Sequence, residues 1–103
     1  YLPVFNVTFE PGCRNNWHVH HAGSGGGQVL ICVDGEGWHQ EEGKPAQRLR
    51  PGDVVEVGAN VKHWHGATTG SWFSHLAFEY PGEDTSTEWL EPVDDEAYAA
   101  LEG

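Results

Sequence analysis

The stretch GCRNNWHVHHAGSGGGQVLICVDG (residues 12–35) holds the features that decide the fold. Within it, WHVHH (17–21) has the alternation of a short strand, and QVLICV (28–33) is continuously apolar, as in a well-buried strand. The apolar run stops at Asp34-Gly35, a dipeptide typical of tight hairpin turns. This pattern predicts a β-hairpin in which GWHQEE (37–42) is the returning strand.

Short alternating segments separated by Gly and Pro continue along the rest of the chain. They predict further strands at 4–10, 46–50, 53–57, 63–67 and 71–79. Many short strands at this spacing indicate an all-β antiparallel sandwich or barrel. Only the tail favours a helix, over 95–101, with Asp94 or Asp95 as its N-cap. A length of 103 residues predicts one domain.

The charge balance excludes two classes of partner. The formal net charge is −11, with only five Lys and Arg. Phosphate groups and anionic lipids are bound by clustered cations, so we expect neither a nucleic-acid nor a membrane partner. The two cysteines, Cys13 and Cys32, are expected to be reduced, which favours a cytoplasmic location.

The histidines cluster in two short segments. Alternate residues of a strand face the same side, so His18 and His20 project together and His21 projects away as a structural residue. The segment KHWHG repeats the alternation with His63 and His65. Imidazole binds several divalent transition metals, so the two pairs predict one metal site. His39 is expected on a solvated face.

The spacing of these residues resembles the two sequence motifs of the cupins. Gly12 is followed by five residues and then His18-Val-His20, and Gln28 is followed by six residues and Gly35. In the second motif Gly52 is followed later by His63. The resemblance implies a double-stranded β-helix (jelly-roll) barrel with a short C-terminal helix. The expected domain covers 1–103, with the core barrel over about 4–80 and the tail and helix over 81–103.

The cupin resemblance also implies a ligand set. The metal ligands would be His18, His20 and His63, with Gln28 at the position that is usually Glu. Gln removes a negative charge, and seven residues separate His20 from Gln28 where the motif has three or four. The Gln28 ligand therefore depends on how the intervening loop folds. We expect one divalent metal ion per chain, with Mn as the first candidate and Fe, Zn or Ni as alternatives.

VTFEPG, WHVHH, RPGDVVEV, KHWHGA and SHLAFE together are similar to a narrower group. These are small cupins related to the carboxymuconolactone-decarboxylase-associated cupins, including the manganese-dependent bacterial hydroxynitrile lyases. The similarity implies that His75 is a general base. It also places Glu79 where those lyases have an amide, which changes the charge of the pocket. The expected substrate pocket contains His65, Phe5, Val7 and Glu79.

These features predict a mononuclear metal-dependent enzyme that acts on a small oxygenated organic molecule by metal-assisted proton transfer. Hydroxynitrile-lyase-like C–C cleavage is one form, and isomerase, decarboxylase or dioxygenase chemistry are others. The alternative class is a non-catalytic small-molecule-binding or sensor cupin, or a structural metal protein. A barrel that has lost its metal ranks lowest, because all three ligand histidines are present. We expect a homodimer or a higher homo-oligomer, paired through exposed strand edges.

Overall fold

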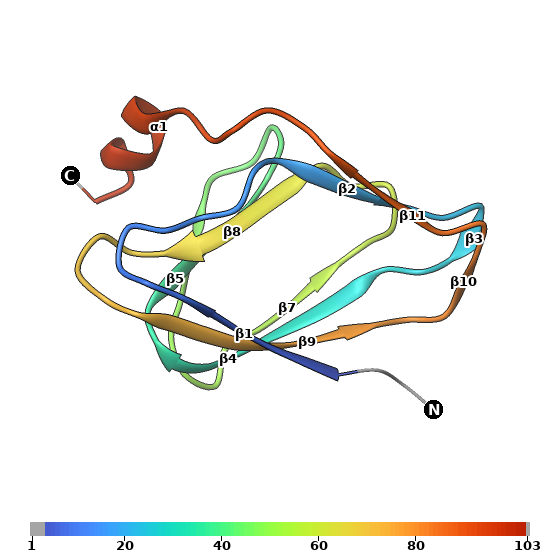
Figure 1. Ribbon diagram of the computed structural model, residues 1–103, viewed down its shortest axis with the longest axis horizontal. Helices are drawn as coiled ribbons and strands as arrows, with labels where there is room; N and C mark the ends of the chain where they lie inside the picture. Colours follow the sequence, from blue (N-terminus) through green and yellow to red (C-terminus); the bar gives the residue numbers. More distant parts are fainter. Residues whose placement is uncertain (1–3, 103) are drawn as a thin grey trace.

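The computed structural model describes residues 4–102 of the chain, so residues 1–3 and 103 of the predicted domain lie outside the described residues. Over this range the chain forms eleven strands and one short helix (Figure 1). The strands are β1 (Val4–Phe9), β2 (His18–His21), β3 (Ser24–Gly25), β4 (Gln28–Gly35), β5 (Gly37–Glu41), β6 (Gln47–Leu49), β7 (Val54–Val57), β8 (His63–Ala67), β9 (Phe73–Glu79), β10 (Gly82–Glu83) and β11 (Ser86–Trp89), and the helix is α1 (Asp95–Ala100).

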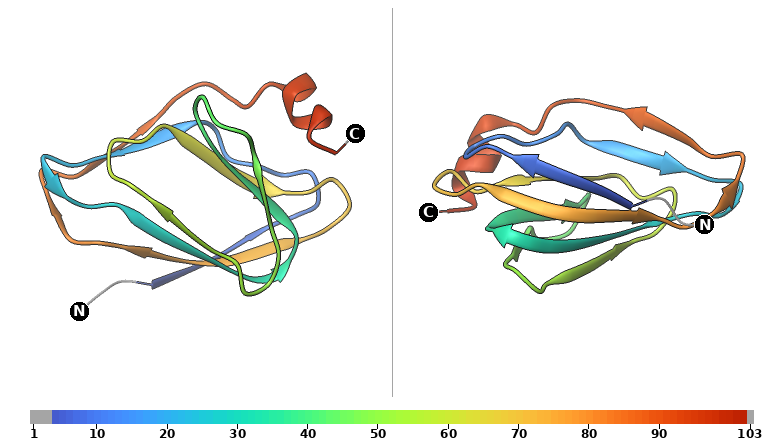
Figure 2. Two further views of the ribbon diagram at one scale, coloured as in Figure 1. Left: turned by 180° about the vertical axis from the view of Figure 1, so that it is seen from behind. Right: turned by 60° about the horizontal axis from the view of Figure 1, so that its bottom comes forward.

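Two antiparallel sheets form the barrel. The four-stranded sheet has the order β1-β9-β4-β7, and the five-stranded sheet has the order β11-β2-β8-β5-β6. A small pair, β10-β3, closes the end of the molecule away from α1 (Figures 1 and 2). This arrangement confirms the predicted all-β jelly-roll barrel with a short C-terminal helix.

The predicted hairpin at Asp34-Gly35 is wrong. β4 pairs with β7 and β9, whereas β5 pairs with β6 and β8, so this turn carries the chain from one sheet to the other. Gly35 is needed there because its φ is 70° and a Cβ would lie 1.7 Å from the carbonyl oxygen of Trp72. The Asp-Gly dipeptide therefore marks a turn here, but one that connects two sheets.

Each predicted strand is present, with ends that differ by up to two residues, but the tail holds more structure than predicted. β11 was not expected, and it pairs with β2 along its whole length. The helix begins after its N-cap Asp94, whose side chain accepts a hydrogen bond from the backbone N–H of Ala97. The tail thus becomes part of the five-stranded sheet.

Two apolar clusters hold the layers together. The first fills the barrel between the sheets and contains Leu30, Leu49 and Phe73. The second lies on the outer face of the five-stranded sheet, where Trp64 packs with Tyr98 of α1 and the half-buried Trp17 joins it. Trp17 and Trp64 therefore have a packing role. Because the tryptophans of β5 and β8 face outward, the alternate residues of those strands face the barrel interior.

Cys13 is exposed, Cys32 is buried, and both thiols are free, as predicted. The helix within residues 4–102 lacks the length and apolar character needed to cross a membrane.

Candidate metal centre and active site

Histidines cover the inner face of the five-stranded sheet. Strand β2 contributes His18 and His20, β8 contributes His63 and His65, and β5 contributes His39. The strand register aligns them, because His18 is paired with His63 and His39 is paired with His65. Five of the seven histidines of the chain therefore meet on one surface.

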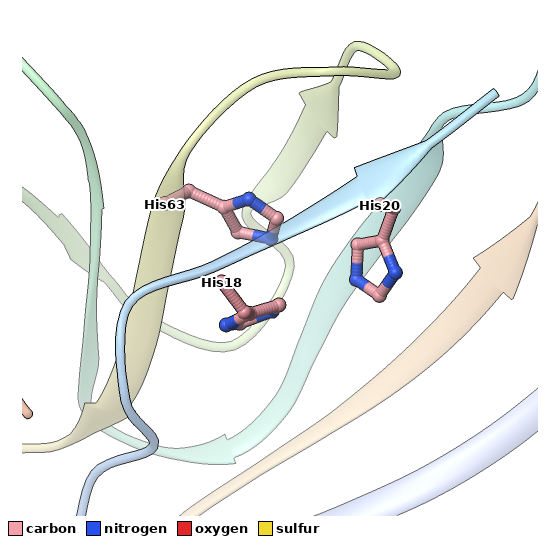
Figure 3. A group of neighbouring side chains, drawn as sticks. All are labelled: His18, His20 and His63. Atoms are coloured by element: carbon pink, nitrogen blue, oxygen red, sulfur yellow. The ribbon is translucent and has the colours of Figure 1, made fainter. Parts of the chain in front are cut away.

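Three of these rings form a compact triad. The ligand nitrogens of His18, His20 and His63 all lie within 4.8 Å of one another (Figure 3). The ring centroids of His18 and His63 are 4.3 Å apart, and those of His18 and His20 are 5.1 Å apart. The side chains from two segments more than forty positions apart in the sequence thus converge on one point.

The outer nitrogens of the triad are already engaged. Nδ1 of His18 and Nδ1 of His63 each donate to the carbonyl oxygen of the residue two positions earlier, at 2.8 and 2.9 Å. A carbonyl only accepts, so these rings carry their proton on Nδ1 and keep a lone pair on Nε2. Nδ1 of His20 lies 3.2 Å from the hydroxyl oxygen of Thr87 on β11. This is the way in which metal-bound histidines are usually oriented.

The inner nitrogens fit a metal ion. Nε2 of His20 and Nε2 of His63 are buried and have no hydrogen-bond partner among residues 4–102. Burial lowers the pKa of His63 to about 4, and it also lowers the pKa of His18 and of His20. The three rings are neutral at pH 7, and those of His18 and His63 present a lone pair on Nε2, which is the state that a divalent metal requires.

Gln28 lies on the opposite sheet and faces the barrel interior. Its side chain is buried, and its Oε1 has no hydrogen-bond partner in the described part of the chain. On β4 it shares the inward face with the buried core residues Leu30 and Cys32. An amide oxygen is therefore available inside the barrel in addition to the three imidazoles.

A second pair of rings, His65 and His75, lies beside the triad. Their centroids are 4.9 Å apart, and that of His65 is 5.6 Å from His18. Phe9 contacts both rings of the pair, at 5.8 and 6.0 Å between centroids. Burial lowers the pKa of both histidines, that of His65 most strongly. The structure therefore brings the predicted base His75 next to the histidine surface.

Comparison with known proteins identifies the family. The family model described as "Cupin domain" matches residues 5–74 of the chain. This chain belongs to the cupin family. The fold and the histidine positions predicted from that resemblance agree with this assignment.

Proteins similar to this chain include an enzyme and a cupin-like protein. The chain is 43% identical over 93 residues to the (R)-mandelonitrile lyase of Granulicella tundricola, which covers 90% of this chain and 68% of the lyase. It superposes on a cupin-like protein from Thermotoga maritima with a TM-score of 0.84 and 41% identity, over 97% of this chain and 72% of the other.

The predicted resemblance to small cupins of the hydroxynitrile lyase type is thereby confirmed. The DMSP lyase DddQ from Ruegeria pomeroyi shares the fold, with a TM-score of 0.75 and 23% identity over 91% of this cupin and 45% of that chain. The family and the histidine triad together indicate a metal cupin.

The other residues predicted for the substrate pocket lie at different depths in this cupin. On β1, Val7 is half-buried opposite His75, whereas Phe5 is 52% exposed opposite Ala77. Glu79 ends β9 on the face that carries His75. It borders a cleft of about 490 Å³ that also includes His20. Glu79 thus stands at an opening of the barrel and next to the triad.

Two histidines outside the predicted site have opposite outcomes. His21 faces outward, and its Nε2 lies 2.7 Å from a carboxylate oxygen of Glu88, so the prediction that it projects away from His18 and His20 is confirmed. The predicted solvated face for His39 is wrong: it is 4% exposed, with its ring 5.8 Å from that of His63. The sequence alternation shows that Trp38 and His39 face opposite sides of β5. Only the pairing of β5 with β8 shows that His39 is the one that faces inward.

Proposed function

We propose that this cupin is a metal-dependent enzyme that acts on a small oxygenated organic molecule by metal-assisted proton transfer, with cyanohydrin cleavage as the first activity to test. The observation that carries the proposal is the triad, in which the Nδ1 atoms are bonded outward and the ligand nitrogens lie within 4.8 Å of one another. The similarity to (R)-mandelonitrile lyase supports the reaction class.

The ligands in this proposal are His18, His20 and His63, with the amide oxygen of Gln28 as a fourth donor. A divalent metal held by these neutral groups would act as a Lewis acid toward a hydroxyl or carbonyl oxygen. Manganese is the first candidate, and iron, zinc or nickel suit the same donors. Because no carboxylate is in the set, the full positive charge of the ion would act on the substrate.

His75 is proposed as the general base. Its Nδ1 is 3.4 Å from the carbonyl oxygen of Leu76, which only accepts, so the lone pair is on Nε2. This Nε2 is buried and has no partner among the described residues, and burial lowers the pKa of the ring. His75 is therefore neutral at pH 7 and is able to take a proton from a hydroxyl group.

In a cyanohydrin the hydroxyl proton would pass to Nε2 of His75. The bond between the carbinol carbon and the nitrile carbon would break, its electron pair leaving on cyanide, while the carbon–oxygen bond becomes a carbonyl. The proton on His75 would then pass to cyanide, which gives hydrogen cyanide and restores the neutral ring. The reaction requires no oxidant and no other co-reactant.

The experiment combines metal analysis with a turnover assay. Protein purified without added metal is analysed by elemental analysis, then loaded with Mn²⁺ and assayed for release of benzaldehyde from mandelonitrile. The variant His75→Asn should keep its metal content and lose about 100-fold or more in turnover, the usual range for a general base. The control His21→Asn, on the outer face, should behave as the unmodified chain.

Three results would count against the proposal. Metal bound far below one ion per chain would contradict the metal centre, and unchanged turnover in His75→Asn would contradict the assigned base. Stoichiometric metal without turnover of any cyanohydrin would favour the alternative class, a small-molecule-binding cupin.

A further inference from the structure

The side chain of Asn15 contacts His65 at two atoms. Its Oδ1 accepts the backbone N–H of His65 at 2.9 Å, and its Nδ2 lies 3.1 Å from Nε2 of the ring. A backbone N–H only donates, so it fixes the amide with its oxygen toward the backbone and its NH₂ toward the ring. The NH₂ group also only donates, so Nε2 of His65 accepts. The ring proton of the neutral His65 must then lie on Nδ1.

The loop that carries Asn15 is held firmly against β8. The backbone N–H of Asn15 donates to the carbonyl of His65, and the N–H of Ala67 donates to the carbonyl of Cys13. Between them Gly66 lets the loop approach, because a Cβ on Gly66 would lie 2.4 Å from Cβ of Arg14. Asn15 therefore has a fixed position relative to the His65 ring.

His65 has the same Nδ1–H tautomer as the proposed ligands His18 and His63, but its unpaired ring nitrogen is the protonated one. Its Nδ1 is a donor, buried and without a partner within residues 4–102. Nε2 of His75, which is equally buried and unpaired, is an acceptor for the reason given above. The two rings are 4.9 Å apart at 89°, and Phe9 lies against both of them. A donor and an acceptor thus stand side by side in the barrel interior, beside the histidine triad.

We propose that Asn15 is a positioning residue that locks His65 in the Nδ1–H tautomer, so that His65 and His75 form a donor–acceptor pair for a single substrate oxygen that carries a hydrogen. A hydroxyl group satisfies both rings: it gives its hydrogen to Nε2 of His75 and accepts from Nδ1 of His65. When the proton moves to His75, the oxygen keeps the hydrogen bond from His65, which stabilises the charge that develops on it.

The donor–acceptor pair of His65 and His75 specifies a substrate class. This part of the inference rests on the proposed function. The substrate has a free hydroxyl on the carbon that reacts. An O-methyl ether of the same molecule has no hydrogen to give to His75 and is excluded. The tautomer of His65 itself follows from the contacts of Asn15 and does not depend on the reaction.

The decisive test is the tautomer. Protein labelled with ¹⁵N at histidine is examined by long-range ¹H–¹⁵N NMR, metal-free and loaded with diamagnetic Zn²⁺, at pH 7.5. We expect His65 to show a protonated Nδ1 and an unprotonated Nε2. In Asn15→Asp the group that faces the ring only accepts, so Nε2 should become protonated. Asn16→Asp, one residue along the same loop with its amide bonded to the carbonyl of Leu90, should leave His65 unchanged.

A second variant covers the case in which Asn15→Asp does not fold. In Asn15→Ala the ring loses its donor, and the fraction of His65 in the Nδ1–H form should fall. A protonated Nε2 in the unmodified protein would overturn the inference, as would an Nδ1–H form that persists in every folded Asn15 variant.

Activity gives an independent readout. Loss of one charge-stabilising donor costs about 100-fold or more in kcat, so Asn15→Asp should lower kcat by this amount while the Zn²⁺ affinity stays within about threefold. A normal kcat in a variant with the reversed tautomer would overturn the role of the pair. Absence of turnover in the unmodified protein would count against the proposed function, and the NMR result would still decide whether Asn15 sets the tautomer.

Discussion

Acid should destabilise the metal-free protein, because the fold holds its interior histidines in the neutral form. Burial is the largest cause that lowers the pKa of each of these side chains. They are His18, His20, His39, His63, His65 and His75. In the unfolded chain the same groups take up protons near pH 6.5. The unfolded state therefore binds more protons below that pH, and stability that is complete above pH 6.5 is lost as the pH falls toward the folded pKa values.

The pKa of His63 gives the size of this loss of stability. Its side chain is fully buried, and its pKa falls from 6.5 to about 4. Each unit of difference between the folded and unfolded pKa is worth about 1.4 kcal/mol, so His63 alone costs about 3 kcal/mol once the pH is well below 4. At pH 5 roughly 2 kcal/mol of this is already lost. The other five histidines act in the same direction.

Urea unfolding of metal-free protein at pH 7.5 and pH 5.0 measures this effect, and the window avoids most carboxylate titration. The free energy of unfolding should fall by more than about 2 kcal/mol between the two pH values. In His63→Asn the fall should be about 2 kcal/mol smaller, while His21→Asn should match the unmodified chain. Equal stability at both pH values, or a His63→Asn protein that is as acid-sensitive as the unmodified one, would refute the reasoning.

Three further substitutions test the surroundings of the site. Thr87→Val removes the hydroxyl beside the ring of His20, so metal affinity in a chelator titration should fall about tenfold. The control Thr8→Val breaks an exposed hydrogen bond to Ser74 on the other sheet and should leave metal affinity unchanged. Gly66→Ala places a Cβ against Arg14 in the loop before β2 and should lower the free energy of unfolding by about 1–3 kcal/mol. The control Gly70→Ala places its Cβ in open space and should be neutral, so equal melting temperatures of the two variants would contradict this prediction. Gln28→Glu should raise metal affinity and lower metal-free stability, because a buried carboxylate needs the ion as its partner, and an unchanged affinity would argue against Gln28 as a ligand.

The parts of the site that sequence predicts are those set by local rules. Period-two alternation puts His18 and His20 on one face of β2 and His63 and His65 on one face of β8. The spacing of the cupin motifs then predicts that the two pairs lie together, and the structure places His18, His20 and His63 in one triad. The helix was predicted for the same reason, since Asp94 as N-cap acts within one turn.

The missed parts depend on pairing between distant segments. Asp34-Gly35 has the composition of a hairpin turn, yet which strand lies beside β4 is decided by β7 and β9. β11 is polar and exposed, and it becomes a strand because its backbone pairs with β2. The inward direction of His39 and the contact of Asn15 with the His65 ring likewise follow from neighbours of β8 that are far away in sequence. No local pattern contains that information.

The distribution of charge bears on the proposed role of Gln28 as a fourth ligand. Among residues 4–102 the buried polar side chains are histidines, Gln28 and Thr68, and no carboxylate is buried. In the proposed metal-bound form the charge of the ion would be balanced by carboxylates outside the ligand set. These are Glu41, which is paired with His63 across β5 and β8, and Glu79, the one carboxylate among the described residues of the cleft beside the triad. A carboxylate at the mouth attracts cations toward the barrel but leaves the ion electrophilic inside it. It would also repel anionic substrates, which supports the proposal of a neutral hydroxyl compound whose negative charge develops only after it has entered.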